Sequence, residues 1–404
     1  MNILQRLYCR TIQFVFRTAM PILPYRQPQL LRTPAEAAQL LRKKKISFVL
    51  LIADANVRRL NLTAPLEAAL HQAYIAYSVY EQHTPNPTID DVEQACGVYR
   101  NAGAKAIIAI GGGSAIDCAK VAGARIARPG KPVSKMRGLL RVMRKTPLMI
   151  AIPTTAGTGS ETTLVAVITD SNAHHKYPIN DFSLIPDYAM LHAPLTASLP
   201  PFLTATTGMD ALTHAIEAYI GRSTTKFTRA MAEEAVKLIV QNLRSACEDG
   251  QNLHARSHML RASYCAGVAF TRSYVGYVHG IAHSLGGQYG VAHGLANAVI
   301  LPHMLRHYGP AITGKLAALA RKAQLASPQA DECDAAEFLI AWIEETNHLF
   351  GIPRGFSMIR EEDIPLMALH AARECNPLYP VPVLMNRREL EAIYDELKHK
   401  EEPR

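Results

Sequence analysis

The chain has 404 residues and a formal net charge of +9, with 49% hydrophobic and 19% charged residues. This length favours two domains, and this composition is typical of packed globular proteins and excludes a largely disordered chain. No apolar run approaches the roughly 18 residues that a membrane-spanning helix needs. The seven cysteines are scattered without a CxxC pair. That pattern argues against a disulfide framework or a thiolate zinc site and favours the reducing cytoplasm.

The first 35 residues form a basic amphipathic arm. Five arginines precede Glu36, the first acidic residue of the chain, and the apolar residues among them are spaced loosely as on an amphipathic helix. We interpret residues 1–35 as an accessory helix. Loose contact with a membrane surface through residues 1–30 and a targeting segment are the alternatives. The basic residues form no nucleic-acid-binding motif, so we expect no nucleic-acid partner.

Residues 36–194 alternate between strand-like and helix-like patterns. The short apolar runs that predict strands are at residues 46–54, 73–80, 105–110, 147–153 and 163–170. Continuous apolar strands are typical of sheets covered on both faces. Strands separated by helices of this size predict a parallel sheet with helices on both sides.

A glycine-rich turn follows the third of these runs in the sequence GGGSAIDCAK. Because Gly112 and Gly113 have no Cβ, their backbone can approach a phosphate closely. The free N–H groups at the start of the following helix, around Ser114, would face the anion. We therefore expect a ligand that carries a pyrophosphate, with a tight structural turn as the alternative.

Asp54 ends the first predicted strand. An acid at this place in a dinucleotide-binding fold can hydrogen-bond ribose hydroxyls and repel a 2′-phosphate, which favours NAD over NADP. Arg58 and Arg59 follow closely and could accept a 2′-phosphate instead. Asp54 could also cap the next helix.

After residue 195 we find helical patterns and no convincing strand. The segments predicted as helices are residues 204–220, 226–247, 254–270, 294–308, 334–349 and 387–399. The proline-rich stretch 193–201 marks the boundary. The expected architecture is therefore a Rossmann-like α/β domain with a parallel sheet (residues 36–194) and an all-α domain (residues 195–404), with the cleft between them as the default site.

Two polar clusters interrupt the helical half. Asp210, His214 and Glu217 are four and three residues apart, so they share one face of a helix. The second cluster contains His279, His283 and His293. One carboxylate with imidazoles suits a divalent transition metal with an open coordination position. The spacing predicts a metal site, but it leaves open which of the three later histidines is not a ligand.

The sequence resembles the iron-containing (group III) alcohol dehydrogenases. The matching stretches are PNPT (85–88), GGGSAIDCAK (111–120), PTTAGTGSE (153–161), GMDALTHAIEAY (208–219), VHGIAHSLGG (278–287) and HGLANAVILPH (293–303). They occur in the same order as in the family, and the resemblance extends from about residue 45 to 400. It implies a dinucleotide-binding α/β domain followed by a helical metal-binding domain.

The resemblance assigns roles to individual positions. The implied metal ligands are Asp210, His214, His279 and His293, and His283 matches a histidine of the active site that is not a ligand. The implied cofactor-binding residues are Asp54, Asn86, Gly112, Gly113, Ser114, Thr154, Thr155, Thr158 and Lys176. Glu217 is interpreted as a helix-packing residue or as a support for a ligand.

The implied activity is that of a metal-dependent alcohol dehydrogenase or aldehyde reductase, active as a homodimer. Hydride would pass between a small alcohol and NAD, with NADP as the alternative. The family implies Fe²⁺, and Zn²⁺ is permitted because its intrinsic affinity is higher. The metal would lower the pKa of the alcohol, and His283 would relay the hydroxyl proton or hydrogen-bond the substrate.

The chain departs from the family pattern in two places. The stretch 20–33 lacks the short strand ending in glycine with which the family usually opens, and Ala292 stands where proline often precedes the last ligand. A phosphate-eliminating cyclase of the dehydroquinate synthase type is the alternative enzyme, but the basic cluster it would need is missing near the later histidines. A non-catalytic membrane-associated binding protein is opposed by the intact metal and glycine motifs. Maleylacetate reductases resemble the family without its metal set, and the four retained ligand positions argue against that assignment.

Overall fold

The structure is a computed structural model that describes residues 1–171 and 175–398. The chain divides into two compact units, which we call the helical unit (Met1–Leu23 and Leu199–Arg404) and the sheet unit (Pro24–Ser198). The basic arm is thus shared between them: its helix belongs to the helical unit, and the residues from Pro24 onward belong to the sheet unit. Among the described residues, no helix combines the length and apolar character that a membrane crossing requires.

The sheet unit is built on a parallel sheet, as predicted. It has six strands in the order β1-β9-β6-β4-β2-β3. These strands are β1 (Gln29–Leu31), β2 (Phe48–Ala53), β3 (Ala76–Tyr80), β4 (Ala106–Gly111), β6 (Leu148–Pro153) and β9 (Tyr188–Met190). The central strands β2, β4 and β6 are buried along almost their whole length. This burial explains their continuous apolar sequences.

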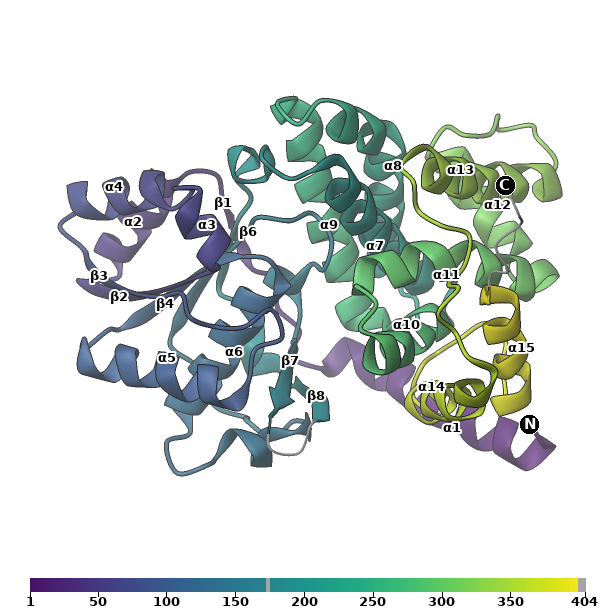
Figure 1. Cartoon of the computed structure of the whole chain (residues 1–404), viewed down its shortest axis with the longest axis horizontal. Helices are drawn as coiled ribbons and strands as arrows, with labels where there is room; N and C mark the ends of the chain where they lie inside the picture. Colours follow the sequence, from purple (N-terminus) through teal and green to yellow (C-terminus); the bar gives the residue numbers. More distant parts are fainter. Residues whose placement is uncertain (172–174, 399–404) are drawn as a thin grey trace. The chain divides into compact units, whose positions relative to one another are not determined.

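Helices cover both faces of this sheet (Figure 1). One face packs against α2 (Pro34–Lys43), α3 (Ala55–Arg59) and α4 (Ala64–Gln72), and the other against α5 (Ile89–Asn101) and α6 (Gly113–Ala127). Each face has its own core of buried aliphatic side chains. The carboxyl ends of β2, β4 and β6 therefore open onto one edge, where the predicted cofactor residues lie.

Two strand predictions need correction. The stretch 20–33 contains β1, which the sequence did not predict because three residues are too few for a recognisable alternation. The run 163–170 is not a strand of the parallel sheet. It forms β7 (Val165–Asp170), which pairs antiparallel with β8 (His175–Asn180) in a separate sheet that also contains β5 (Gly138–Leu139). Burial alternates along β7, as expected for a strand covered on one face.

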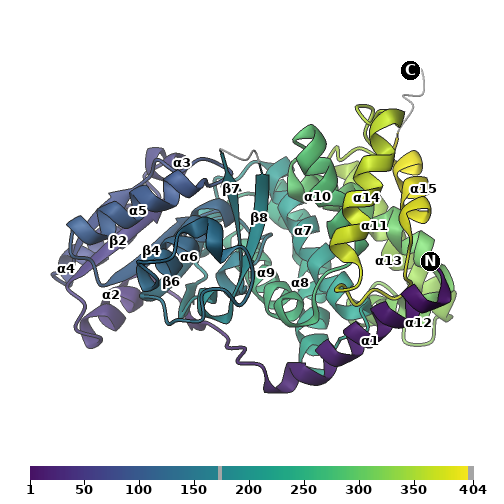
Figure 2. The same ribbon diagram turned by 90° about the horizontal axis from the view of Figure 1, so that it is seen from below.

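In the described residues of the helical unit, the regular secondary structure is helical and contains no strand, as predicted. The helices are α1 (Ile3–Ala19), α7 (Pro201–Ile220), α8 (Lys226–Glu248), α9 (Leu253–Ser273), α10 (Tyr277–Tyr289), α11 (His293–Tyr308), α12 (Thr313–Lys322), α13 (Glu332–Leu349), α14 (Ile364–Cys375) and α15 (Arg387–Leu397). The long antiparallel pair α8 and α9 packs beside α7, and α7 also packs against α11. Figure 2 shows α1 along the outside of this unit.

Candidate metal centre and nucleotide-binding turn

Three helices of the helical unit carry the predicted metal ligands. Asp210 and His214 lie on α7, His279 on α10, and His293 is the first residue of α11. Close packing brings α11 to α7, because a Cβ at Gly294 would lie 2.7 Å from the backbone oxygen of Thr206. Glycine at this position therefore lets the start of α11 approach the backbone of α7 directly.

The four predicted ligands converge. Their donor atoms all lie within 4.8 Å of one another. Asp210 Oδ1 is 3.6 Å from His293 Nε2 and 3.9 Å from His214 Nδ1. Asp210, His214 and His279 are buried, and His293 is partly exposed. Phe270 of α9 stacks on the His214 ring, with 4.1 Å between ring centroids, and so fixes its plane.

Glu217 supports His279 from behind. His279 Nδ1 donates to Glu217 Oε2 at 2.6 Å, and the same carboxylate accepts from the backbone N–H groups of Gly276 at 2.8 Å and Val278 at 2.9 Å. This places a carboxylate at the N-terminus of α10, where the helix dipole favours negative charge. With its Nδ1 proton held by Glu217, His279 presents the lone pair of Nε2 to the other ligands.

Burial shapes the protonation of this pair. It raises the pKa of Glu217 to about 7, although the hydrogen bonds to the carboxylate oppose the shift. Burial, with the neighbouring histidines His214, His293 and His283, lowers the pKa of His279 well below its ordinary value. A neutral imidazole is the form that binds a metal.

Asn297 of α11 is a residue of this centre that the sequence analysis missed. Its Nδ2 lies 2.7 Å from Asp210 Oδ1, 3.2 Å from His279 Nε2 and 3.1 Å from His293 Nε2. Its Oδ1 is buried without a hydrogen-bond partner. The four-residue spacing from His293 was the available signal, because it places both side chains on one face of α11.

The contacts of Asn297 test whether these residues fit a metal. Three acceptor atoms, one oxygen and two imidazole nitrogens, converge on one amide nitrogen, whose two hydrogens cannot serve all three. A divalent cation satisfies such a set of lone pairs at once, and one carboxylate with three imidazoles is suited to Fe²⁺ or Zn²⁺. The residues therefore fit the metal that the sequence predicts.

His283 stands beside this set and not within it. Its ring stacks on that of His293 with 5.2 Å between centroids and an angle of 18°, and its side chain is 44% exposed. Glu374 of α14 holds it, because His283 Nδ1 donates to Glu374 Oε1 at 2.6 Å, and the hydroxyl of Tyr379 donates to the same oxygen at 2.8 Å. Burial alone would raise the pKa of Glu374, but His283 and these hydrogen bonds bring it below its ordinary value.

The glycine turn of the sheet unit joins β4 to α6. Asp54 Oδ2 accepts from the backbone N–H of Gly112 at 2.7 Å, and Asp54 Oδ1 is 3.3 Å from His83 Nε2. Thr154 N–H donates to the carbonyl of Gly111 at 3.0 Å. Asp54 thus lies against the turn. It occupies the N-cap position of α3 but makes no side-chain cap hydrogen bond to that helix.

The loop after β6 packs against the same turn. A Cβ at Gly113 would lie 3.1 Å from Thr158 Cγ2, and one at Gly112 would lie 3.9 Å from Thr155 Cγ2. The Ser114 hydroxyl donates to the carbonyl of Pro85. The structure therefore brings the following predicted cofactor residues together: Asp54, Gly112, Gly113, Ser114, Thr154, Thr155 and Thr158.

Asn86 and Lys176 also meet, with Lys176 Nζ donating to Asn86 Oδ1 at 2.9 Å. Asp91 holds the preceding segment in place, since its carboxylate accepts from Thr84 and Thr88 at the start of α5. Arg58 is engaged elsewhere: it pairs with Glu67 and lies 3.1 Å from Glu81.

A buried polar network fixes the loop after β6, and no sequence signal pointed to it. Lys120 Nζ donates to Ser160 Oγ at 3.0 Å, Thr163 Oγ1 at 2.8 Å and the carbonyl of Val165 at 2.9 Å. Asp117 accepts from Ser160 Oγ at 2.6 Å. Burial lowers the pKa of Lys120 to about 8. The loop that carries Thr158 is therefore held to α6 by buried hydrogen bonds.

Comparisons with known proteins agree with this fold and site. Residues 32–193 match the family described as iron-containing alcohol dehydrogenase, and residues 204–397 match the Fe-containing alcohol dehydrogenase family, C-terminal. The chain belongs to the iron-containing alcohol dehydrogenase family.

Individual relatives are similar over most of their length. The NAD-dependent methanol dehydrogenase of Bacillus methanolicus is 37% identical over 324 residues, which cover 80% of this chain and 85% of the relative. The 1,3-propanediol dehydrogenase of Klebsiella pneumoniae is 35% identical over 385 residues, which cover 94% of this chain and 98% of the relative. A crystal structure of 1,3-propanediol oxidoreductase superimposes with a TM-score of 0.88 at 33% identity, covering 92% of this chain and 99% of the other.

Proposed function

We propose that this chain is a metal-dependent alcohol dehydrogenase, acting in reverse as an aldehyde reductase, that transfers hydride between a small alcohol and NAD. The observation that carries the proposal is the convergence of Asp210 and three imidazoles within 4.8 Å. Membership of the family and similarity to relatives named for methanol and 1,3-propanediol support small alcohols as the substrate class.

The helical unit supplies the metal ligands and the group that moves the proton. Asp210, His214, His279 and His293 would hold the divalent cation, and Glu217 holds the His279 ring in the orientation that directs Nε2 toward the other ligands. When bound, the cation supplies Lewis acidity that lowers the pKa of an alcohol. His283 is the exposed imidazole beside this set, and its Nε2 would accept the hydroxyl proton while Glu374 stabilises the charged ring through Nδ1.

The sheet unit supplies the cofactor site. The free N–H groups at the start of α6 and the side chains of Thr155 and Thr158 would bind the pyrophosphate. NAD is favoured over NADP because Asp54 lies at the turn and Arg58 is paired with Glu67 and Glu81. Asn86 and Lys176 would line the same site. When bound, the nicotinamide would supply the hydride acceptor.

The groups around the later histidines argue against the phosphate-eliminating cyclase. The side chains that hydrogen-bond to His279 and His283 include Glu217, Glu374 and Asn297, which are acidic or neutral. A phosphorylated acid would require cations there. Iron is favoured by the family, and zinc would also suit the donor set.

A metal analysis of the purified protein, coupled to NADH absorbance across a panel of small alcohols and aldehydes, tests the proposal. We expect a chelator to abolish turnover and one added metal to restore it. Full turnover in the chelated protein would contradict the metal-dependent chemistry.

We further propose a homodimer in the cytoplasm, peripheral to a membrane through residues 1–30. The family resemblance supports the dimer, and the seven cysteines, none in a disulfide, support a reducing compartment. Sedimentation equilibrium measures the oligomeric state, and cell fractionation of the full chain measures the compartment. A monomer, or protein found only in an oxidising compartment, would contradict these assignments.

A further inference from the structure

Helix α1 docks on the helical unit through the side that carries Arg10, Gln13 and Phe16, whose ring lies 6.1 Å from that of Tyr274 between centroids. Gln13 Nε2 donates to the carbonyls of Tyr379 at 2.7 Å and Pro377 at 3.3 Å. Arg10 donates to the carbonyls of Val381 at 2.7 Å and Pro382 at 2.8 Å. The buried residues of α1 are Cys9 and Gln13. The helix is therefore fastened along one edge to the segment 377–382, which follows α14.

The opposite side of α1 is apolar and exposed. At 100° per residue, six large side chains fall on one face of the helix. They are Ile3 (82% exposed), Leu4 (73%), Leu7 (64%), Tyr8 (60%), Phe14 (63%) and Val15 (56%). We call these six residues the outer face. The exposed residues Thr11 and Thr18 lie between them on the same face. Single exposed apolar residues are ordinary, but six on one face mark a surface that contacts something other than water.

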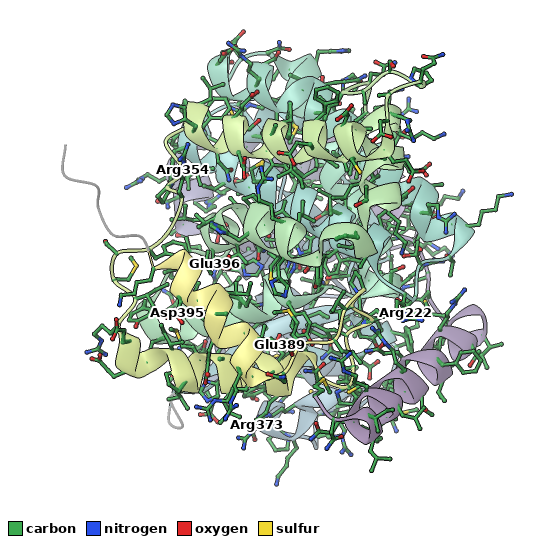
Figure 3. The ribbon with its side chains drawn as sticks, turned by 90° about the vertical axis from the view of Figure 1, so that its right-hand side faces the viewer. Arg222, Arg354, Arg373, Glu389, Asp395 and Glu396 are labelled. Atoms are coloured by element: carbon green, nitrogen blue, oxygen red, sulfur yellow. The ribbon has the colours of Figure 1, made fainter. Side chains whose placement is uncertain are left out.

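Cations border the outer face. Arg6 and Arg17 are exposed on α1 itself, and residues 1–35 contain no acidic residue. Arg222 lies at the segment that Arg10 contacts, because its backbone N–H donates to the carbonyl of Pro380 at 2.7 Å. Figure 3 labels Arg222 near the purple ribbon of α1. Lys315 lies next to Arg222, because its Nζ donates to the carbonyls of Ile220 at 2.6 Å and Gly221 at 3.1 Å.

Glu389 is an acidic residue near the first turn of α1. It follows Asn386, which borders the same hollow as Gln5 and Tyr8, and its carboxylate caps α15 by accepting from the backbone N–H of Asn386 at 2.6 Å. Its single negative charge is outweighed by the arginines Arg6, Arg10 and Arg17 of α1. The helix itself therefore presents positive charge beside the outer face.

An exposed apolar face with arginines beside it favours some partners over others. Two copies of the chain docked through their outer faces would bring Arg6 and Arg17 of one copy close to those of the other, which is unfavourable. A surface of anionic lipids provides both an apolar layer for the outer face and negative charge for its border.

We propose that α1 lies in the headgroup region of an anionic membrane with its outer face inserted, so that the enzyme is held at the membrane surface. The proposal deepens the peripheral membrane contact proposed above. It concerns residues outside both segments that match the family, 32–193 and 204–397, so it can fail while the dehydrogenase function stands.

Sedimentation of the full chain with vesicles tests the proposal. One set of vesicles is phosphatidylcholine alone and the other contains equal parts of phosphatidylcholine and phosphatidylglycerol. We expect the protein to bind the anionic vesicles, and the double variant Leu7→Glu/Phe14→Glu to lose more than about tenfold in partitioning because two charges would enter the apolar layer. Phe338→Glu is the matched control, since Phe338 on α13 is 51% exposed and its replacement should leave binding unchanged.

The role of the arginines beside the outer face is tested separately. We expect Arg6→Gln and Arg17→Gln each to weaken binding to the anionic vesicles by about fivefold, and not to change binding to phosphatidylcholine. Turnover without vesicles and the melting temperature are measured for every variant to show that it is folded. The proposal is overturned if the wild-type protein does not bind anionic vesicles, or if Phe338→Glu loses as much binding as the double variant. A fall in the protein's mass in solution for the double variant, with vesicle binding unchanged, would assign the outer face to a second copy instead.

Discussion

Replacement of Glu217 examines how the protein prepares its metal ligands. Glu217→Ala removes the acceptor of the 2.6 Å hydrogen bond from His279 and of two backbone hydrogen bonds at the start of α10. Loss of a carboxylate that orients a ligating histidine lowers metal affinity by about 10- to 100-fold, or roughly 1.4–2.7 kcal/mol. We expect a loss toward the upper end, because the backbone at Gly276 and Val278 is released together with the ring.

The measurement is a competitive titration of Zn²⁺ or Fe²⁺ into the metal-free protein. Glu217→Gln keeps one oxygen acceptor in nearly the same place, so it should recover part of the affinity. Glu233→Gln is the control: Glu233 lies in the same unit and contacts the Tyr219 hydroxyl at 3.4 Å, outside the cluster. Metal affinity of Glu217→Ala within twofold of the wild-type value would refute the idea that Glu217 positions His279.

Three further outcomes follow from the structure. His279→Ala should abolish metal retention in a metal analysis, whereas His283→Ala should keep the metal and lower turnover; the reverse would overturn the assignment of ligands. Gly113→Ala should weaken NADH binding about tenfold in a fluorescence titration, with unchanged metal content, because the added methyl crowds Thr158 at 3.1 Å and narrows the anion site. Lys120→Met should lower the free energy of unfolding by about 3 kcal/mol at pH 7, because it breaks a buried charged network. Burial lowers the pKa of Lys120 from 10.5 to about 8 in the folded state. Between about pH 8 and 10.5, Lys120 therefore binds more protons in the unfolded chain than in the folded one. Its contribution makes the free energy of unfolding rise with pH across this range. Denaturant unfolding of the variant should lack that rise, and a retained rise would contradict the assignment.

The parallel sheet and the long helices could be predicted because their sequences are regular. The runs that became β2, β4 and β6 are apolar throughout, since both faces are covered. Strand β1 was missed because it has three residues and depends on β9 for its partner. The run that became β7 was placed in the wrong sheet, because a pattern of apolar residues predicts a strand but does not say which neighbour it will pair with.

The cluster of Asp210 and the histidines could be predicted because residues four apart share one face of a helix. Spacing alone left three later histidines open, and the structure separates His283 from the others by its partner Glu374, which lies 91 residues further along the chain. Asn297 and Lys120 were missed for a different reason. Asparagine and lysine in a helix are ordinarily exposed, and only burial reveals that these two carry buried hydrogen-bond networks.

The docking of α1 has a consequence for the His283 imidazole. Gln13 donates to the carbonyl of Tyr379, the hydroxyl of Tyr379 donates to Glu374, and Glu374 accepts the Nδ1 proton of His283. Helix α1 and the imidazole that we propose as the proton acceptor are therefore linked through opposite ends of one tyrosine. A displacement of Gln13 would act on the His283 ring through two intervening side chains, those of Tyr379 and Glu374.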